Sequence, residues 1–152
     1  MKVLVQRVSR AEVRVAGRVV GSIGKGLLVL VGVERGDSPD DADYLADKTA
    51  DLRVFPDGEG KMNRSLIEAS GEALVVSQFT LAGSTRRGRR PSFDAAALPA
   101  EAEPLYHEYA LRLAARGVRV ATGTFSAMLE VELVNDGPVT LMLDPPPGRD
   151  PR

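Results

Sequence analysis

The chain has 152 residues, of which 43% are hydrophobic and 27% are charged, and its formal net charge is −1. This length predicts one domain with a sizeable core, and the composition is not that of a disordered chain. The absence of cysteine excludes disulfides, thiolate metal sites and cysteine nucleophiles, and the near-neutral charge gives no overall attraction to nucleic acid.

Neither a membrane span nor a secretion signal is expected. The longest apolar run, residues 27–33, is far short of the ~20 residues that a membrane helix needs. The first seven residues, MKVLVQR, lack the long apolar core and cleavage site of a signal peptide. We therefore expect a soluble cytoplasmic protein.

The N-terminal part of the chain is predicted to form β-strands. Residues 2–9, 12–15 and 18–23 are rich in valine, with a turn at Ala16-Gly17 before the third of them. Residues 27–33 are apolar without interruption, which indicates a central strand covered on both faces.

A helix is predicted over residues 40–52. Gly36-Asp37-Ser38-Pro39 supplies a capping residue followed by proline in the first turn. The apolar stripe that follows has helical spacing and consists of Ala42, Leu45, Ala46, Thr49 and Leu52. Short strands are expected near residues 52–55 and 62–67, on either side of a turn at 57–60, and a buried strand at 73–80.

The C-terminal half begins with a basic loop, residues 82–92. A second helix is predicted over residues 100–116, ended by Gly117. Its buried side consists of Leu105, Tyr106, Tyr109, Ala110 and Leu113. The last predicted strands are residues 118–121, 128–134 and 139–143, and Asn135-Asp136-Gly137 is the expected hairpin turn between the final two.

These elements predict an α+β fold. Mostly antiparallel β-sheets are expected to form a barrel-like or sandwich-like core, with two main helices packed on one side. Residues 1–144 are expected to form the single domain, and the proline-rich residues 145–152 to be a disordered tail.

Conventional catalytic machinery is scarce. His107 is the one histidine, and it falls on the side of the second helix opposite Leu105, so a Ser-His-Asp arrangement lacks a base. No set of histidines and carboxylates has metal-ligand spacing, so neither a metal nor another cofactor is expected. Residues 21–26 superficially suggest a phosphate-binding loop, but they precede a strand and are read as a turn.

Three segments keep two interpretations each when the residues are considered alone. Ser77-Gln78-Phe79-Thr80-Leu81 is either an ordinary strand end or a strand end whose backbone N–H groups form an oxyanion hole. Asn135-Asp136-Gly137-Pro138-Val139-Thr140 is either a simple turn or a turn with a cis Gly-Pro bond. The guanidinium groups in the basic loop are either solvated or bind a phosphate backbone, and they belong to Arg86, Arg87, Arg89 and Arg90.

Several stretches, in this order along the chain, carry a resemblance to one family. They are Gln6-Arg7-Val8, residues 26–32, Gly60-Lys61-Met62-Asn63, residues 75–81, Gly88-Arg89-Arg90-Pro91-Ser92-Phe93 and residues 135–140. Through these stretches the chain, up to Leu143, resembles the D-aminoacyl-tRNA deacylases, also called D-tyrosyl-tRNA deacylases. Ser-Gln-Phe-Thr-Leu and Asn-Asp-Gly-Pro-Val-Thr are signatures of that family.

The resemblance implies a homodimer that hydrolyses D-aminoacyl-tRNA, and also glycyl-tRNA mischarged on tRNA-Ala. It implies that Gly137-Pro138 is a cis dipeptide that each subunit inserts into the other's site to reject L-amino acids. The strand end, Ser77, Gln78, Phe79 and Thr80, would line the pocket for the terminal adenosine and the ester, mainly through main-chain groups, with help from the substrate's 2′-hydroxyl.

The resemblance also assigns supporting roles. Arg7 would hold the Gly-Pro loop, and Phe125, Ala127 and Leu129 fall in the stretch that closes the pocket. The four arginines would hold acceptor-stem phosphates, and DNA is not an expected partner. Two departures stand out: Leu129-Glu130 replaces a Met-Gln pair of many relatives, and Thr124 occupies a position that is often arginine.

Two other functions stay open. An RNA-binding β module without catalysis would explain the arginine loop but leave Gly137-Pro138 as an idle turn. A metal-free esterase acting on small D-amino acid esters, or a hydrolase of D-peptides, would explain the strand end but leave the arginines unused.

Overall fold

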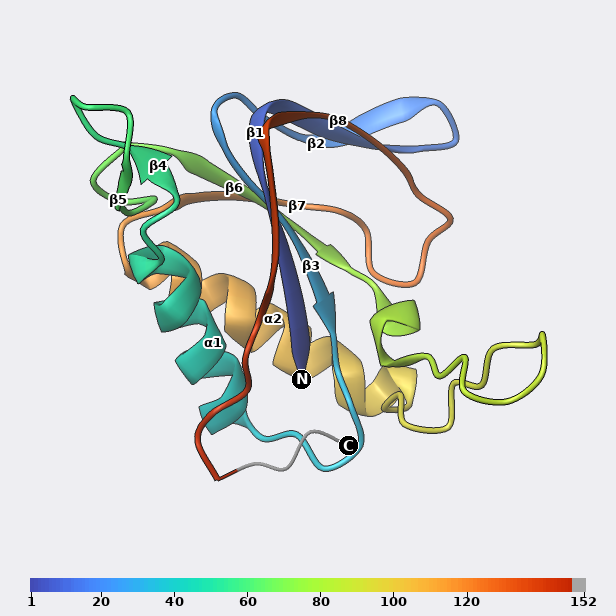
Figure 1. The fold of residues 1–152 in the computed structure, drawn as a ribbon. Helices are drawn as coiled ribbons and strands as arrows, with labels where there is room; N and C mark the ends of the chain where they lie inside the picture. Colours follow the sequence, from blue (N-terminus) through green and yellow to red (C-terminus); the bar gives the residue numbers. More distant parts are fainter. Residues whose placement is uncertain (149–152) are drawn as a thin grey trace.

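A computed structural model of the chain describes residues 1–148, in which two helices cover one side of a mixed β-sheet (Figure 1). In chain order the elements are β1 (Lys2–Val15), β2 (Arg18–Ile23), β3 (Gly26–Gly32), α1 (Pro39–Asp51), β4 (Phe55–Pro56), β5 (Met62–Arg64), β6 (Glu72–Ser77), the 3-10 turn η1 (Phe79–Ala82), α2 (Pro99–Ala115), β7 (Arg119–Thr122) and β8 (Glu130–Leu143). The predicted α+β class is confirmed.

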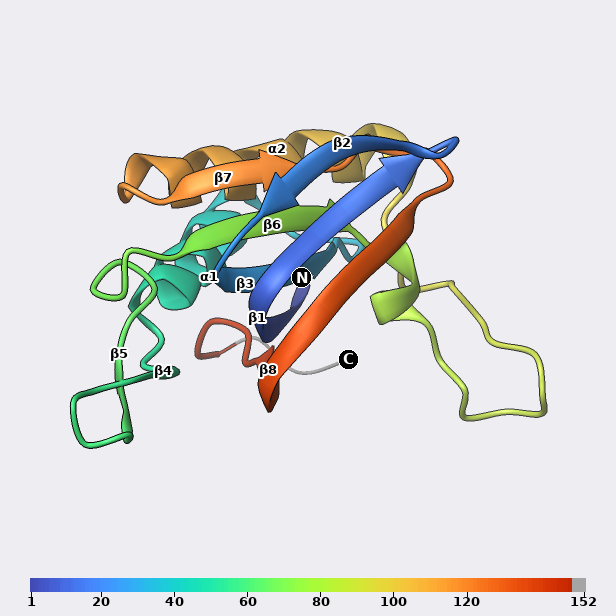
Figure 2. The same cartoon turned by 90° about the horizontal axis from the view of Figure 1, so that it is seen from above.

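The main sheet has six strands in the order β2-β1-β3-β6-β7, with β8 added as a further neighbour of β1. All pairings of β1 are antiparallel, whereas β3–β6 and β6–β7 are parallel. The sheet curls until its two ends nearly meet (Figure 2). A Cβ atom added to Gly21 of β2 would lie 2.5 Å from the Thr122 carbonyl oxygen of β7, so glycine permits this approach.

The core lies on both faces of β3, as its apolar sequence predicted. Leu27, Val29 and Val31 pack in the cluster between the sheet and the helices, whereas Leu28 joins a second cluster with Val8 and residues of other strands. On the helix side the Tyr106 hydroxyl donates a hydrogen bond to the Val75 carbonyl oxygen at 2.9 Å. Burial raises the pKa of Tyr106 to about 12, so this hydroxyl stays a donor at neutral pH.

Both helices match their predicted ranges to within one residue at each end. Ser38 is the N-cap residue of α1 and Pro39 its first residue, and the Ser38 N–H donates to the Asp41 carboxylate at 2.8 Å. At the end of α2, Gly117 has φ of 91°, the left-handed conformation that glycine adopts without strain. Local start and stop signals were therefore sufficient to place the helices.

Several strand predictions were wrong in their bounds. Residues 2–9 and 12–15 belong to one strand, β1, and the strand predicted over 73–80 ends at Ser77, after which η1 begins. The strands on either side of the turn at 57–60 are shorter than expected, as the bounds of β4 and β5 show.

The predicted hairpin at residues 135–137 is also wrong. Residues on both sides of it belong to β8, a single strand that pairs with β1 along its length. Thr140 lies opposite Gln6 and Asn135 opposite Val8, so more residues intervene on β8 than on β1 and the segment bulges out of the ladder. A long β1 pairs with both halves and overrides the local turn signal.

The predicted tail falls partly outside the described residues, at 149–152. Residues 145–148 have no helix or strand, and Pro145, Pro146 and Gly148 lie beside the start of β1. The domain boundary at residue 144 stays a prediction. Within the described part of the chain, no helix has the length and apolar character needed to cross a membrane.

Candidate functional site

The predicted strand end lies at the carboxyl edge of a buried strand. β6 is central and parallel to both β3 and β7, and its residues Ala73 to Val76 are all buried. The Gln78 N–H donates to the Val31 carbonyl oxygen at 2.8 Å, which is the last contact with β3 before the chain turns into η1. Functional groups are commonly displayed at such an edge, where parallel strands end together.

The turn η1 leaves two main-chain donors available. The Leu81 N–H donates to the Gln78 carbonyl oxygen at 3.2 Å, and the Gly83 N–H to the Thr80 carbonyl oxygen at 3.0 Å. The first N–H groups of a helical turn have no acceptor within the turn, and here these belong to Phe79 and Thr80. Both residues are exposed.

A glycine at the end of β3 allows the turn to pack closely. A Cβ atom added to Gly32 would lie 2.9 Å from both the Gln78 carbonyl oxygen and the Leu81 Cβ. This contact gives a physical reason for Gly32 in the matching stretch 26–32. Neither its spacing nor its neighbours in the sequence signalled that contact, because the turn comes from a distant segment.

The side chains at the strand end do not form an activated nucleophile. The Gln78 side-chain amide donates a hydrogen bond to the Thr80 hydroxyl. His107 lies exposed on α2, as predicted, with its Nε2 atom 3.5 Å from the Glu103 carboxylate. Within residues 1–148, no group of three or more His, Cys, Asp or Glu side chains is arranged to hold a metal ion. The strand end thus offers main-chain N–H donors beside an amide and a hydroxyl that bond to each other.

The Gly-Pro segment forms the bulge in β8, and its Gly137–Pro138 peptide bond is cis. Arg7 contacts it from β1: its Nε donates to the Asp136 carbonyl oxygen at 3.1 Å, and its Nη1 donates to the Val54 carbonyl oxygen at 2.7 Å. One largely buried side chain thus ties the bulge to the segment that leads into β4. Sequence reasoning missed Val54, because its contact is made by the main chain and has no residue-type signal.

Asn135 closes the bulge at its base. Its Oδ1 accepts a hydrogen bond from the Val139 N–H at 3.2 Å, and its Nδ2 donates to the Thr140 hydroxyl at 3.0 Å. Gly137 has φ of 123°, and an added Cβ atom would lie 2.7 Å from an Arg7 guanidinium nitrogen. Glycine, asparagine and arginine are therefore each required by the shape of this segment.

One chain does not bring the strand end and the Gly-Pro segment together. Along the ladder, Ser77 pairs with Val31 and Val31 with Val3, whereas the bulge starts beside Val8. Gly137 and Pro138 lie in the unpaired part of the bulge opposite Arg7, four residues from Val3 along β1, which corresponds to roughly 13 Å at about 3.3 Å per residue. The strands β3 and β1 also separate β6 from β8.

The segment between β7 and β8 holds the remaining predicted pocket residues. The Phe125 ring lies 5.8 Å from the Tyr106 ring, between centroids, and packs against the helix-side core. Leu129 packs partly buried against the second cluster, and Ala127 is half-buried.

The two departures from the family pattern, Thr124 and Glu130, are both exposed. The negative charge of Glu130 contributes to raising the pKa of Arg14. The pKa of Arg14 is raised first by its hydrogen bond to Glu132, then by the neighbouring carboxylates, Glu130 among them. Glu130 therefore adds negative charge near the start of β8 without entering the core.

The four arginines lie on a loop that projects from the end of η1 (Figure 1). The Ser84 and Ser92 main chains close its base with two hydrogen bonds, of 2.7 and 2.9 Å. Arg86, Arg87, Arg89 and Arg90 are exposed, and among residues 1–148 none of them has an ion-pair partner. The structure thus places a free basic loop directly beside the strand end.

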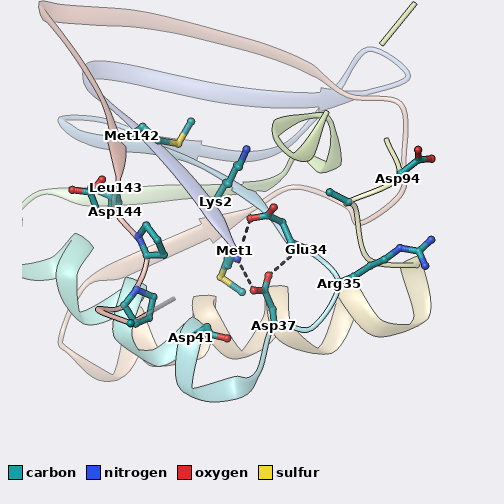
Figure 3. A pocket seen from close by; sticks show the side chains of 14 residues that line it. Met1, Lys2, Glu34, Arg35, Asp37, Asp41, Asp94, Met142, Leu143 and Asp144 are labelled. Carbon is teal, nitrogen blue, oxygen red and sulfur yellow. Dashed lines mark hydrogen bonds and ion pairs between the residues drawn. The ribbon is translucent and has the colours of Figure 1, made fainter. Parts of the chain in front are cut away.

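A cavity of about 840 Å³ lies elsewhere, and none of the predicted site residues lines it. It surrounds the amino terminus, where the Met1 ammonium group is 2.6 Å from an Asp37 carboxylate oxygen and 3.4 Å from a Glu34 oxygen (Figure 3). These interactions hold the start of β1 against the segment that leads into α1.

The chain is similar to known proteins over nearly its whole length. Residues 4–144 match the family model described as D-Tyr-tRNA(Tyr) deacylase. A D-aminoacyl-tRNA deacylase of Symbiobacterium thermophilum is 61% identical over 144 residues, covering 95% of each chain. One of Roseiflexus castenholzii is 56% identical over 152 residues, covering 100% of this chain and 97% of that protein.

A solved structure with the same fold carries a different description, "c-Myc DNA Unwinding Element Binding Protein". It superimposes with a TM-score of 0.88 at 37% sequence identity, covering 95% of this chain and 98% of that chain. The same fold thus occurs in proteins that are described differently.

Proposed function

Because the chain belongs to the D-Tyr-tRNA(Tyr) deacylase family, we propose that it hydrolyses the ester bond of D-aminoacyl-tRNAs and releases free D-amino acid and tRNA. The observation that carries this proposal is the family match over residues 4–144, which includes every predicted site residue. An enzyme with this substrate is expected to work in the cytoplasm, where aminoacyl-tRNA is used.

The proposed chemistry relies on the main chain of the strand end. The ester carbonyl lies against Phe79 and Thr80, whose N–H groups donate to the oxygen as it gains negative charge. One such donor lowers the barrier by about 3 kcal/mol in comparable sites. Ser77 and Gln78 line the pocket, and the free N–H groups of η1 support this assignment.

Water attacks the ester without a covalent intermediate on the protein. The 2′-hydroxyl of the terminal ribose is the proposed proton relay, which takes a proton from the attacking water and passes its own to the departing 3′-oxygen, because the strand end offers no histidine. A D-aminoacyl-tRNA ending in 2′-deoxyadenosine should then show a kcat reduced by about 100-fold, since a positioned general base contributes about that factor. An undiminished kcat would exclude this role.

We propose that the protein is a homodimer and that it selects D-amino acids by excluding L side chains from its pocket. Gly137–Pro138 of one subunit enters the pocket of the other and leaves room for hydrogen on one side of the substrate Cα. An L side chain collides there, a D side chain points to solvent, and glycine passes, so glycyl-tRNA mischarged on tRNA-Ala is also a substrate. The distance between strand end and Gly-Pro segment within one chain supports a partner's contribution.

The outer edge of β8 supports a subunit interface. Among residues 1–148 this strand pairs on one side only, with β1, and it carries several apolar side chains that are between 37% and 51% exposed. They are Val131, Val134, Leu141 and Met142. A long apolar edge strand is a surface that proteins ordinarily cover.

RNA binding is proposed to centre on the single-stranded 3′ end and the arginine loop. The terminal adenosine occupies the pocket closed by Phe125, Ala127 and Leu129, and the four arginines contact acceptor-stem phosphates. Replacing Arg86 and Arg87 by glutamine should raise KM and flatten its dependence on salt, while kcat stays nearly constant.

Incubation with D-Tyr-tRNA and L-Tyr-tRNA tests the proposed function. Selective release of D-tyrosine supports the deacylase, whereas tRNA binding without release supports an RNA-binding module. Hydrolysis of free D-tyrosine esters with no activity on tRNA supports the small-molecule esterase. Because one structural relative is described as binding DNA, single-stranded DNA of the same 3′ sequence is a useful competitor.

A further inference from the structure

Two exposed aromatic rings lie in contact beside the strand end. Phe79 and Phe93 pack edge to face, with ring centroids 5.3 Å apart and an interplanar angle of 65°. Phe79 is 56% exposed and Phe93 is 40% exposed. Apolar side chains of this size are ordinarily buried, so an exposed pair indicates a surface that contacts something.

The pair is held in place by the surrounding backbone. A Cβ atom added to Gly83 would lie 2.9 Å from the Phe93 ring, so this ring rests directly on the glycine main chain. Two main-chain hydrogen bonds between Ser84 and Ser92 close the loop one residue before Phe93. The rings are therefore presented as a preformed surface and do not need to be ordered on binding.

The same loop supplies charge next to the rings. It leaves η1, carries Arg86, Arg87, Arg89 and Arg90, and returns at Phe93, so the aromatic pair lies at its base. These arginines have no ion-pair partner among residues 1–148. Exposed aromatic rings beside a basic segment are the combination that binds single-stranded nucleic acid, by base stacking and phosphate contacts.

We propose that Phe79 and Phe93 form a stacking surface for the base adjacent to the terminal adenosine of the tRNA 3′ end. The inference rests on the proposed function, which puts the terminal adenosine and the ester at Ser77–Thr80. The next nucleotide of the single strand then leaves the pocket over the rings, and the acceptor-stem phosphates continue toward the arginines. Phe93 is in this arrangement a positioning residue, which orients the substrate without touching the ester.

Phe93→Leu tests this role, because leucine keeps an apolar side chain and removes the ring. We expect KM for D-Tyr-tRNA to rise about tenfold, in the range observed when one stacked base loses its aromatic partner, with kcat nearly unchanged. Phe93→Tyr keeps a stacking ring and should behave like the wild type. Leu111→Ala, which removes an apolar side chain that is 68% exposed on α2, is the matched surface control and should change nothing.

A truncated substrate separates this inference from the proposed function. D-Tyrosyl-adenosine, esterified at the ribose, lacks the second base, so Phe93→Leu and wild type should hydrolyse it at equal rates. Failure of the wild type on both substrates would overturn the proposed function itself. Equal losses on both substrates, or no loss on either, would overturn only the stacking role.

A stacking-sensitive base gives a direct readout. tRNA carrying 2-aminopurine in place of the base next to the terminal adenosine should lose fluorescence on binding to wild type, and much less on binding to Phe93→Leu at saturation. An unaltered signal in the variant contradicts the proposal. So does dissociation of the oligomer by Phe93→Leu, since the rings would then belong to a protein interface.

Discussion

Phe79 is the residue where the proposed chemistry can be tested without altering a catalytic side chain. Phe79→Pro removes one N–H donor together with the Phe79 ring, whose loss acts on KM, so kcat reports on the donor. Proline is tolerated at the first position of a helical turn. The preceding Gln78 has φ of −140° and ψ of 81°, outside the α region that proline disfavours before it. We expect kcat to fall about 100- to 1,000-fold, as for loss of an oxyanion-hole donor elsewhere.

The comparison for Phe79→Pro is Thr80→Ala, which keeps the N–H and removes the hydroxyl. Single-turnover hydrolysis of D-Tyr-tRNA should stay within about tenfold of wild type, because the hydroxyl is no nucleophile. Complete loss of turnover in folded, substrate-binding Thr80→Ala would show that a covalent mechanism had been wrongly dismissed.

Arg7 makes a prediction about selectivity. It donates to two carbonyl oxygens, those of Asp136 and Val54, and lysine has no second nitrogen with which to reach both. Arg7→Lys should loosen the Gly-Pro segment and raise the ratio of L-Tyr-tRNA to D-Tyr-tRNA hydrolysis about tenfold, equivalent to one charge-assisted hydrogen bond.

The control for Arg7 is Arg10→Lys on the same strand, where the arginine is exposed and makes a 3.5 Å ion pair with Glu132. Its selectivity should match that of the wild type. If Arg7→Lys discriminates as well as Arg10→Lys, the contact with the bulge has no bearing on handedness.

At the scale of elements, the two helices are joined by a charge cluster whose effect depends on pH. The Asp47 carboxylate of α1 accepts hydrogen bonds from Arg112 at 2.9 and 3.0 Å and from Arg116 at 3.1 Å. These contacts, that of Arg112 foremost, lower the pKa of Asp47 below its ordinary 3.8. The folded state therefore favours the ionised form, and the resulting stability is present above pH 4 and lost as the pH falls below it.

Asp47→Asn removes this contribution at neutral pH. We expect Tm to be about 1–3 °C lower than wild type at pH 7, a small difference because the cluster is solvent-exposed. The gap should narrow as the pH falls below the ordinary carboxyl pKa, since the wild-type carboxylate is then progressively neutralised. Glu59→Gln, in an exposed turn, controls for general charge effects, and a gap that does not narrow between pH 7 and the acid limit of folding would contradict the assignment.

The elements also show what the sequence could predict. Periodicity and capping residues placed α1 and α2 correctly, because those signals are local. The Asn135-Asp136-Gly137 turn signal failed, because strand pairing with β1 comes from residues more than a hundred positions away. The same limit applies to the site: residue types marked the strand end as a candidate and the family resemblance added Arg7, but main-chain partners such as Val54 have no identifying side chain.

At the scale of the molecule, closure of the sheet depends on a small residue. Gly21→Ala would place a Cβ atom 2.5 Å from the Thr122 carbonyl oxygen and 3.3 Å from a Leu74 methyl group, so β2 must move away from β7. We expect a free energy of unfolding lower by about 1–3 kcal/mol, as for overpacking, measured by denaturant unfolding. Gly24→Ala, whose added atom would meet only a Glu72 carboxylate oxygen at 3.5 Å, should be nearly neutral.

The proposed exchange of Gly-Pro segments between subunits makes each site depend on two chains, which can be disabled separately. Phe79→Pro chains have a defective strand end but an intact Gly-Pro segment. Gly137→Val chains have an intact strand end, but their Gly-Pro segment is distorted, because a side chain at φ of 123° is strained and collides with Arg7. Alone, the first variant should be inactive and the second should hydrolyse L-Tyr-tRNA as well as D-Tyr-tRNA.

Co-assembly of the two variants then shows whether the Gly-Pro segment acts across the subunit boundary or within its own chain. With Phe79→Pro chains in large excess, nearly every Gly137→Val strand end receives its Gly-Pro segment from an inactive partner. If that segment acts across the subunit boundary, adding the inactive chain should suppress hydrolysis of L-Tyr-tRNA while hydrolysis of D-Tyr-tRNA continues. If it acts within its own chain, the ratio of the two rates stays at the value for Gly137→Val alone. The roughly 13 Å offset between Val3 and Arg7 along the β1 ladder favours the first result, since a segment held by Arg7 lies away from the strand end of its own chain.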